Sequence, residues 1–221
     1  MPPISMPPIL AIGNKAYSSW SLRPWILMAH FNIPFEEKVV PLYTEKSGRA
    51  IARLSPGGKV PALIDGGIRV WESLAIIEYI AEKHPRKAIW PKDAAARAHA
   101  RSLSAEMHAG FTGLRRRFPT NFRRMPAARE LTPQAAGDVA RLEKAWASAR
   151  KQFGRGGAFL YGEFCAADAM FAPVANRIHA YQIPVSRASR AYVDALLALP
   201  AYQAWLKDAA QEAWRIEDFE K

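Results

Sequence analysis

The chain has 221 residues, of which 50% are hydrophobic and 23% are charged, a composition typical of a globular protein with a buried core. It excludes a disordered or fibrous chain, and no apolar run approaches the ~18 residues that a membrane span needs. The length suits one large domain or two small ones. Residues 1–8 contain prolines and no basic residue, so we expect no secretory signal and a cytoplasmic protein.

The single cysteine, Cys165, excludes an internal disulfide and a cysteine-based zinc site within one chain, and we expect no bound metal. Lys and Arg number 31 against 20 Asp and Glu, and the net charge of +11 raises nucleic acid, a membrane surface or a small anion as partners. The arginines are scattered, with local groups at 115–117 and 123–124, and no basic tail follows. This pattern favours a solvated basic surface, so we predict neither nucleic-acid nor membrane binding.

Short apolar runs alternate with a helical stretch at the start of the chain. Ile9–Ile12 and Phe35–Val40 have the composition of strands. Between them, Leu22–Phe31 has apolar residues at helical spacing, and Pro24 falls where a first helical turn tolerates proline. The pattern predicts a βαβ opening.

A hairpin and a further helix come next. The runs 61–64 and 68–71 flank the turn sequence Asp65-Gly66-Gly67, which is typical of a β-hairpin. Residues 72–83 then place their apolar side chains on one helical face. The predicted order is therefore βαβ, a linking helix, and ββα.

The chain changes character after Pro85, which interrupts this helix. No convincing strand follows Trp90, and alanine-rich helical segments are predicted at 93–118, 133–153, 165–181, 187–199 and 201–214. We therefore expect an α/β domain over 1–84, a linker over 85–92, and an all-α domain over 93–221.

Three serines, Ser18, Ser19 and Ser21, lie between the first strand and the first helix, where helix N–H groups favour negative charge. In the simplest interpretation Ser21 is the N-cap of the helix. Three serines exceed what a cap needs, so Ser18 or Ser19 could donate a hydrogen bond to a thiolate of the substrate and lower the pKa of that thiol. No His or Asp follows at a spacing that suggests a serine hydrolase triad.

Pro61 opens the third strand directly after the loop 56–58. Proline is sterically allowed as the first residue of a strand, which is one interpretation. The other is a cis Val60–Pro61 bond, which would turn the Val60 backbone N–H and C=O toward the first helix and leave them free to pair with an extended peptide.

Glu72 and Ser73 stand where the hairpin joins the next helix. They can act as a helix cap and a favourable first-turn charge. Alternatively, the Ser73 hydroxyl and backbone N–H bind a carboxylate while Glu72 pairs with an α-ammonium group. An amino-acid zwitterion fits the second interpretation.

These features together resemble the glutathione transferase superfamily, whose members join a thioredoxin-like domain to an all-helical domain, and the resemblance spans most of the chain. The zeta class, which includes the maleylacetoacetate isomerases, is the most similar. Its SSCSxR motif is similar to residues 18–23, and its V-P and [EQ]-S elements match residues 60–61 and 72–73. The resemblance implies glutathione as co-substrate and a cis Pro61, with glutathione-binding residues Ser18, Ser19, Lys59, Val60, Pro61, Glu72 and Ser73.

The resemblance also implies the catalytic residues. Ser18 matches the first serine of the family motif and is the first choice for the hydroxyl that faces the glutathione sulfur, with Ser19 second. A homodimer is implied as well, with the N-terminal domain of one subunit against the helices of the other.

A further match covers residues 159–169, which resemble the helix-starting box of the family's C-terminal domain, where a Ser or Thr and an Asp cap the helix reciprocally. Cys165 stands at the hydroxyl position here. Since a thiol is a weak hydrogen-bonding group, Asp168 is expected to carry more of the capping and Cys165 to be a buried, unreactive thiol.

The sequence departs from the zeta motif at Trp20, which replaces a cysteine and adds an indole at the mouth of the site. Residues 104–118 fall on the predicted first helix of the second domain, where such proteins bind their electrophile. This segment is either a solvated basic face with a packed His108, or the wall of a second-substrate pocket formed by Trp20, His108, Phe111 and Arg115. His108 and Arg115 are seven residues apart, so on one helix they would share a face and present a cation to an acidic substrate.

The predicted function is a glutathione transferase, or a glutathione-dependent isomerase, that serves detoxification. Glutathione would be held along the first domain and its thiolate stabilised by a serine hydroxyl for attack on a small electrophile. The alternative is a non-catalytic binding or interaction protein on the same fold, with the basic surface as its working part.

Overall fold

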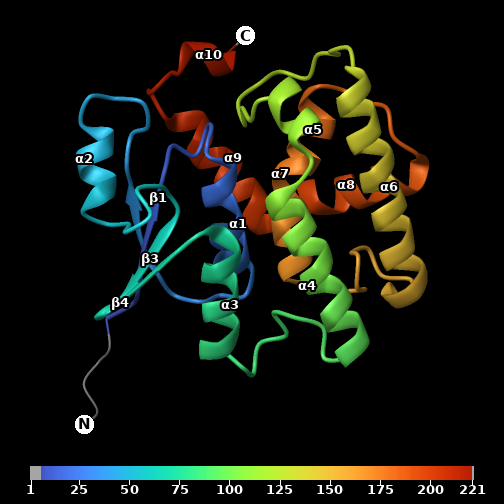
Figure 1. The fold of residues 1–221 in the computed structure, drawn as a ribbon, viewed down its shortest axis with the longest axis horizontal. Coiled ribbons are helices and arrows are strands. Elements are labelled where there is room, and N and C mark those ends of the chain that lie inside the picture. Colours follow the sequence, from blue (N-terminus) through green and yellow to red (C-terminus); the bar gives the residue numbers. More distant parts are fainter. Residues whose placement is uncertain (1–5, 221) are drawn as a thin grey trace.

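The computed structural model describes residues 6–220, so the expectation about a leader peptide, made on residues 1–8, lies mostly outside the described residues. A mixed four-stranded sheet has the order β2-β1-β3-β4 (Figure 1). Its strands are β1 (Ile9–Ile12), β2 (Glu36–Val39), β3 (Ala62–Asp65) and β4 (Ile68–Trp71). β1 pairs parallel with β2, while the β1–β3 and β3–β4 pairs are antiparallel. The predicted hairpin is confirmed.

Three helices belong to the same part of the chain: α1 (Ser19–His30), α2 (Ser47–Ala52) and α3 (Ser73–Lys83). α1 and α3 pack against each other beside the sheet, and α2 stands at its other side (Figure 1). The predicted first helix began too late, at Leu22. Because α1 begins at Ser19, Pro24 lies inside the helix and not in its first turn.

After α3 the described residues form helices joined by loops, with isolated bridges near residue 160. Its helices are α4 (Ala94–Ala109), α5 (Thr112–Arg117), α6 (Pro133–Phe153), α7 (Ala166–Ala180), α8 (Arg187–Leu197), α9 (Pro200–Gln211) and α10 (Glu217–Glu220). The fold class, a thioredoxin-like α/β part followed by an all-α part, is therefore confirmed. Among residues 6–220, no helix is both long and apolar enough to cross a bilayer.

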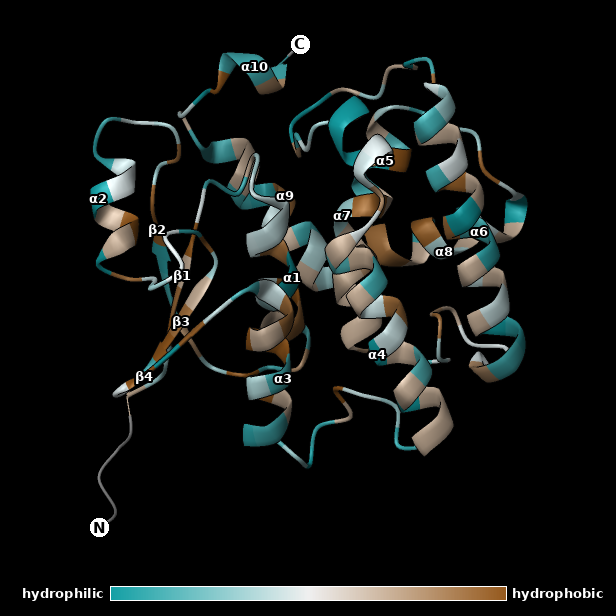
Figure 2. Cartoon of the chain, in the orientation of Figure 1, coloured by the Kyte–Doolittle hydropathy of each residue, from teal (hydrophilic) through white to brown (hydrophobic). Residues whose placement is uncertain are grey.

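Helix α7 is the centre of the helical part. It is buried along its length except at His179, and it contacts α1, α4 and α8. In Figure 2 its visible turns and strand β3 carry hydrophobic colours, whereas the outer turns of α6 are largely hydrophilic. One hydrophobic cluster joins α1 and α3 to α7, so the sheet side and the helical side share a core.

Two predicted helices in the second part of the chain also differ from the structure. The segment 93–118 is interrupted between α4 and α5, because Phe111 has a left-handed backbone with φ of 55°. A hydrogen bond from the Gly110 N–H to the Glu106 carbonyl ends α4, and the chain changes direction before Thr112. The segment 201–214 ends at Gln211, and the short α10 was not predicted.

Candidate functional site

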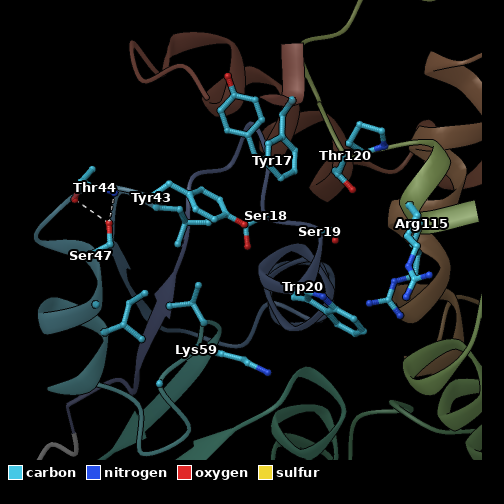
Figure 3. A pocket seen from close by; sticks show the side chains of 18 of the residues that line it. Tyr17, Ser18, Ser19, Trp20, Tyr43, Thr44, Ser47, Lys59, Arg115 and Thr120 are labelled. Carbon is cyan, nitrogen blue, oxygen red and sulfur yellow. Dashed lines mark hydrogen bonds between the residues drawn. The ribbon is translucent and has the colours of Figure 1, made fainter. Parts of the chain in front are cut away.

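A cleft of about 940 Å³ lies between the loops at the end of the sheet and the helical side of the molecule (Figure 3). One wall is formed by the start of α1, the segment 42–51 and the loop 58–60. The other wall comes from α5, the loop after it, α7 and the C-terminal segment. The residues used below from this lining are Ser18, Ser19, Trp20, Tyr43, Lys59, Val60, Arg115, Thr120, Arg177 and Phe219.

Ser18, the residue expected to face a thiol, is the N-cap of α1. Its Oγ accepts a hydrogen bond from the Ser21 backbone N–H at 3.4 Å, and its hydroxyl donates to Ser21 Oγ at 2.7 Å. Ser21 is buried inside the first turn, where its Oγ also accepts the Gly13 N–H at 3.0 Å. The simplest interpretation, with Ser21 as cap, is therefore wrong. The cap is Ser18, which lines the cleft with 7% of its surface exposed.

Ser19 is the first residue of α1 and also lines the cleft, half-buried. Its carbonyl accepts a hydrogen bond from Arg23 Nη1 at 3.1 Å. The two serines therefore lie side by side at the positive end of one helix, where backbone N–H groups favour an anion.

The loop that presents Ser18 is held by the C-terminal part of the chain. The carboxylate of Glu212 accepts the Lys15 N–H at 2.7 Å and the Ala16 N–H at 2.9 Å. The buried Lys15 ammonium pairs with Glu37 and Asp208, at 2.7 Å and 2.6 Å. The contacts of Glu212 with the Lys15 and Ala16 N–H groups, which we call the Glu212 clasp, fix the backbone two residues before Ser18.

The Val60–Pro61 peptide bond is cis, as the resemblance implied. Val60 and Lys59 line the cleft, while Pro61 is buried directly before β3. In Figure 3 Lys59 extends its ammonium into the cleft from the wall opposite Arg115.

Glu72 and Ser73 stand outside the cleft lining. Glu72 has a φ of 69° and lies with its carboxylate 3.5 Å from His108 Nε2. The Ser73 hydroxyl donates to the Trp20 carbonyl at 2.9 Å, which ties the start of α3 to the start of α1. The hydroxyl that was expected to bind a carboxylate is thus engaged inside the protein. The Ser73 backbone N–H, in the first turn of α3, has no acceptor within its own helix.

Trp20 contacts two guanidinium groups. Cζ of Arg23 is 4.0 Å from the indole centroid and Cζ of Arg115 is 4.7 Å from it, and the His108 ring meets the indole edge-on at 5.1 Å. Arg23 is buried, whereas Arg115 lines the cleft. Cation–π contacts of this kind contribute about 0.5–2 kcal/mol each.

The expected wall residues separate into two groups. Trp20 and Arg115 line the cleft, but His108 and Phe111 do not. The argument that His108 and Arg115 share one helix face is wrong, since they stand on α4 and α5; they converge on Trp20 instead. Burial lowers the pKa of His108, and the Glu72 carboxylate partly offsets this effect. Phe111 is 6% exposed and packs in the core.

Several cleft residues were not predicted from the sequence. Thr120 and Arg177 come from the helical side, and Phe219 comes from the C-terminal segment. This segment is held over the cleft because the Tyr17 hydroxyl meets Glu220, Arg123 and the Ile216 N–H. The aromatic ring of Phe219 packs on Tyr17 at 5.7 Å and on Tyr43 at 6.0 Å. No local sequence motif predicts these contacts, because they join residues about 100 to 200 positions apart.

Cys165 is buried at the start of α7, and burial raises the pKa of its thiol, as expected for an unreactive group. The Asp168 carboxylate accepts the Cys165 N–H at 2.9 Å, the Leu160 N–H at 3.2 Å and the Tyr192 hydroxyl at 2.9 Å. Asp168 therefore carries the capping expected of it. No cluster of three or more His, Cys, Asp or Glu side chains suited to a metal ion occurs within the described residues.

Comparisons with known proteins point to one superfamily. Residues 17–83 match the family model for the glutathione S-transferase N-terminal domain. A probable maleylacetoacetate isomerase of Caenorhabditis elegans is 37% identical over 107 residues, covering 48% of this chain and 49% of that protein. Glutathione S-transferase theta-1 of Mus musculus is 42% identical over 87 residues, covering 38% and 35%. The chain thus spans half or less of the length of the curated relatives it matches.

The fold comparison covers nearly the whole chain. A glutathione transferase homologue from Burkholderia GL BGR1, solved with bound glutathione, aligns with a TM-score of 0.69 at 24% identity, covering 93% of this chain and 98% of that one. Human glutathione S-transferase T1-1 aligns with a TM-score of 0.63 at 23% identity, covering 92% and 91%. Residues 17–83 are therefore similar to a glutathione S-transferase N-terminal domain, and the chain has the fold of these two glutathione transferase structures.

Proposed function

We propose that this protein is a glutathione transferase that binds glutathione in the cleft, stabilises its thiolate with the Ser18 hydroxyl, and transfers or adds the thiolate to a small electrophile. The observation that carries the proposal is the position of Ser18. It caps α1, lines the cleft, and donates a hydrogen bond to the buried Ser21. Ser19, beside it, is the second choice.

This reaction requires the protein to stabilise the thiolate of glutathione more than the neutral thiol. Lowering a thiol pKa by about 2 units takes about 3 kcal/mol, at 1.36 kcal/mol per unit. A hydrogen bond to a charged group contributes about 1.5–3 kcal/mol, and a helix N-terminus contributes about 0.3–1 kcal/mol. Both are available at Ser18 when its hydroxyl turns from Ser21 to the sulfur, and Ser21 can then donate to Ser18 Oγ in return.

Glutathione would lie along the sheet side of the cleft. The Val60 backbone beside cis Pro61 would pair with the extended peptide, and Lys59 would meet one of its carboxylates. Glu72 would take the α-ammonium group. Because the Ser73 hydroxyl is bonded to Trp20, the Ser73 backbone N–H is the group we assign to the other carboxylate.

The second substrate would enter from the helical side. Trp20 and Arg115 would form the wall of its binding site, and the His108 ring would hold the Trp20 indole in place through their edge-on contact. The left-handed backbone of Phe111 would set the bend between α4 and α5. In this arrangement the sulfur of glutathione, held at Ser18, faces the second substrate.

We also propose a cytoplasmic homodimer, with a division of each subunit at 1–84 and 93–221. Ile68 and Trp71 on the edge strand β4 are 52% and 42% exposed, and such apolar side chains are suited to burial against a partner subunit. Sedimentation of the purified protein tests this assembly.

Substitution of the two serines tests the enzymatic proposal. Ser18→Ala is expected to lower turnover of glutathione with an aryl halide at pH 6.5 by tenfold or more, while Ser19→Ala lowers it less. Unchanged turnover in both variants would exclude a hydroxyl role for either serine. Binding of glutathione without turnover of any conjugation or isomerisation substrate would favour the non-catalytic alternative.

A further inference from the structure

His108 reaches from the helical part of the molecule to Glu72, the residue assigned above to the α-ammonium group of glutathione. It lies in the last turn of α4, and its Nε2 is 3.5 Å from a carboxylate oxygen of Glu72. A formed N–H···O hydrogen bond is about 2.7–3.2 Å long, so a small rotation of the Glu72 side chain would complete the bond. The contact therefore joins the helical part of the chain to the glutathione side of the site.

Trp20 holds the imidazole in place beside Glu72. The indole meets the His108 ring edge-on, with the ring centroids 5.1 Å apart. The Trp20 carbonyl also accepts the Ser73 hydroxyl at 2.9 Å, so the residue that follows Glu72 is tied to the same tryptophan. The starts of α1 and α3 and the end of α4 meet at this cluster, which fixes the imidazole relative to the carboxylate.

The surroundings of the ring favour a neutral imidazole with its proton on Nε2. The carboxylate lies at Nε2, whereas Nδ1 of His108 is buried and has no hydrogen-bond partner among residues 6–220. A protonated ring would bury an Nδ1–H group without an acceptor, which costs free energy. The lowered pKa of His108 agrees with this geometry.

The charged groups that face His108 come from three elements. Burial is the main cause of its lowered pKa; Glu72, before α3, opposes that effect, and Arg23 of α1 and Arg115 of α5 add to it. The helices packed against α4 are α3, α6 and α7, and within residues 6–220 no ion pair joins His108 to a charged side chain of any of them. Glu72 is thus the carboxylate that a proton on His108 would affect.

We propose that His108 is a positioning residue for glutathione, whose neutral imidazole donates from Nε2 to Glu72 and holds that carboxylate toward the α-ammonium group. The inference rests on the proposed function, which assigns the α-ammonium group to Glu72. A neutral donor orients the carboxylate and leaves its negative charge to the ligand. A protonated His108 would instead pair with Glu72 and compete with the ammonium group of the ligand.

The preference of the site for an α-ammonium group tests this role. The probes are S-methylglutathione and its desamino analogue, in which hydrogen replaces the α-ammonium group, titrated into the full chain by calorimetry at pH 7.5 and pH 5. We expect wild type to bind S-methylglutathione about tenfold or more tightly than the analogue at pH 7.5. This ratio should fall about fivefold or more at pH 5, as His108 gains a proton. The same ratio at both pH values would overturn the inference.

Two substitutions separate the donor from the ring. His108→Gln keeps a neutral donor, so it should keep the wild-type ratio at pH 7.5 within about threefold and lose the change at pH 5. His108→Phe keeps a ring against Trp20 without a donor, so its ratio at pH 7.5 should fall about fivefold or more. His179→Gln, at an exposed histidine of α7, is the matched control and should follow wild type at both pH values. A ratio in His108→Phe equal to that of wild type would show that the ring serves packing alone and contradict the proposal.

Turnover provides a readout that separates this role from that of the serine. With glutathione varied at pH 6.5 and an aryl halide in excess, His108→Phe should raise the KM for glutathione about threefold or more and change kcat less than about twofold. Ser18→Ala, which acts on the thiolate, should lower kcat. A fall in kcat without a change in KM in His108→Phe would overturn the positioning role.

The outcomes distinguish this inference from the proposed function. A preference for the ammonium ligand that is the same in wild type, His108→Gln and His108→Phe overturns the role of His108 and retains the glutathione site. A preference that depends on His108, with no turnover of any electrophile, retains the role and contradicts the transferase. Failure of wild type to bind S-methylglutathione contradicts the proposed function and this inference with it.

Discussion

The hydroxyl oxygens of Ser18 and Ser21 lie 2.7 Å apart, one at the cleft and the other fully buried. Because Ser21 Oγ already accepts the Gly13 N–H, its own hydrogen can point to Ser18 Oγ when Ser18 donates to a ligand. Ser21 is therefore a positioning residue for Ser18. Its place in the sequence suggests a helix cap, but the cap is Ser18, and Ser21 is the buried hydrogen-bond partner of that cap.

Replacing Ser21 should weaken both the loop and the thiolate. Ser21→Ala leaves the buried Gly13 N–H without its acceptor, so the free energy of unfolding should fall by about 1–3 kcal/mol. The pKa of the thiol of bound glutathione should rise, since the Ser18 hydroxyl loses the hydrogen bond with Ser21 that positions it. Urea denaturation and a pH profile of turnover measure the two effects. Ser102→Ala, at an exposed serine of α4, is the control, and a variant that matched this control in both readouts would contradict the account.

The Glu212 clasp predicts an effect on the site from the far end of the chain. Glu212→Ala removes the acceptor of the Lys15 and Ala16 N–H groups, which should cost about 1–3 kcal/mol of stability and raise the KM for glutathione more than it lowers kcat. The exposed Glu217 is the matched control. Should Glu217→Ala raise KM equally, the clasp would not be what positions the loop.

Tyr17 is next to Ser18, yet its hydroxyl serves the C-terminal segment. Burial and the hydrogen bond with Glu220 raise the pKa of Tyr17, so the phenol stays protonated. Tyr17→Phe should speed proteolysis of the segment 212–220 and leave the pKa of the bound thiol unchanged. Limited proteolysis and ultraviolet titration of bound glutathione measure these outcomes. A raised thiol pKa in Tyr17→Phe would instead make the phenol a thiol-stabilising group.

Asp168 predicts a pH dependence of stability. Burial raises its pKa to about 6, from an ordinary value of 3.8. Between about pH 4 and pH 6 the folded state binds more protons at this group than the unfolded state, so its contribution to the free energy of unfolding falls as the pH rises. A shift of about 2 units corresponds to about 3 kcal/mol.

Asp168→Asn checks that sign. The variant should lose about 1–3 kcal/mol, because the amide keeps the oxygen that accepts from Leu160 and Tyr192 but places an NH2 group against the Cys165 N–H, and it should lack the decline between pH 4 and pH 6 that this carboxyl causes. Urea denaturation across that range compares it with wild type. Asp93→Asn, at the exposed cap of α4, controls for the loss of a capping carboxylate. Parallel pH profiles for wild type and Asp168→Asn would contradict the prediction.

The local parts of the fold could be predicted from the sequence. Two strand-like runs on either side of the turn sequence 65–67 predicted the hairpin, and α6 begins at Pro133 and ends at Phe153 as its helical period indicates. The break at Phe111 could not be predicted, since a left-handed phenylalanine leaves no signal in composition. Its consequence was the wrong placement of His108 and Arg115 on one helix.

The site divides in the same way. Ser18, Lys59 and Val60 stand in a local motif and do line the cleft. Thr120 and Arg177 join it only through packing between segments distant in the chain, for which a single sequence holds no periodic signal. Ser73 shows a third case: the motif placed it correctly at the start of α3, but its hydroxyl found a partner in the Trp20 carbonyl.

The most direct test of the account is an ultraviolet difference titration of glutathione bound to the wild-type protein and to Ser18→Ala, from pH 5.5 to 8, with binding followed by calorimetry. The account predicts thiolate absorbance about 2 pH units below the pKa of the free thiol in wild type, and a shift back toward the free value in Ser18→Ala with glutathione still bound. Glutathione that binds with an unshifted thiol pKa, or no binding at all, would contradict it.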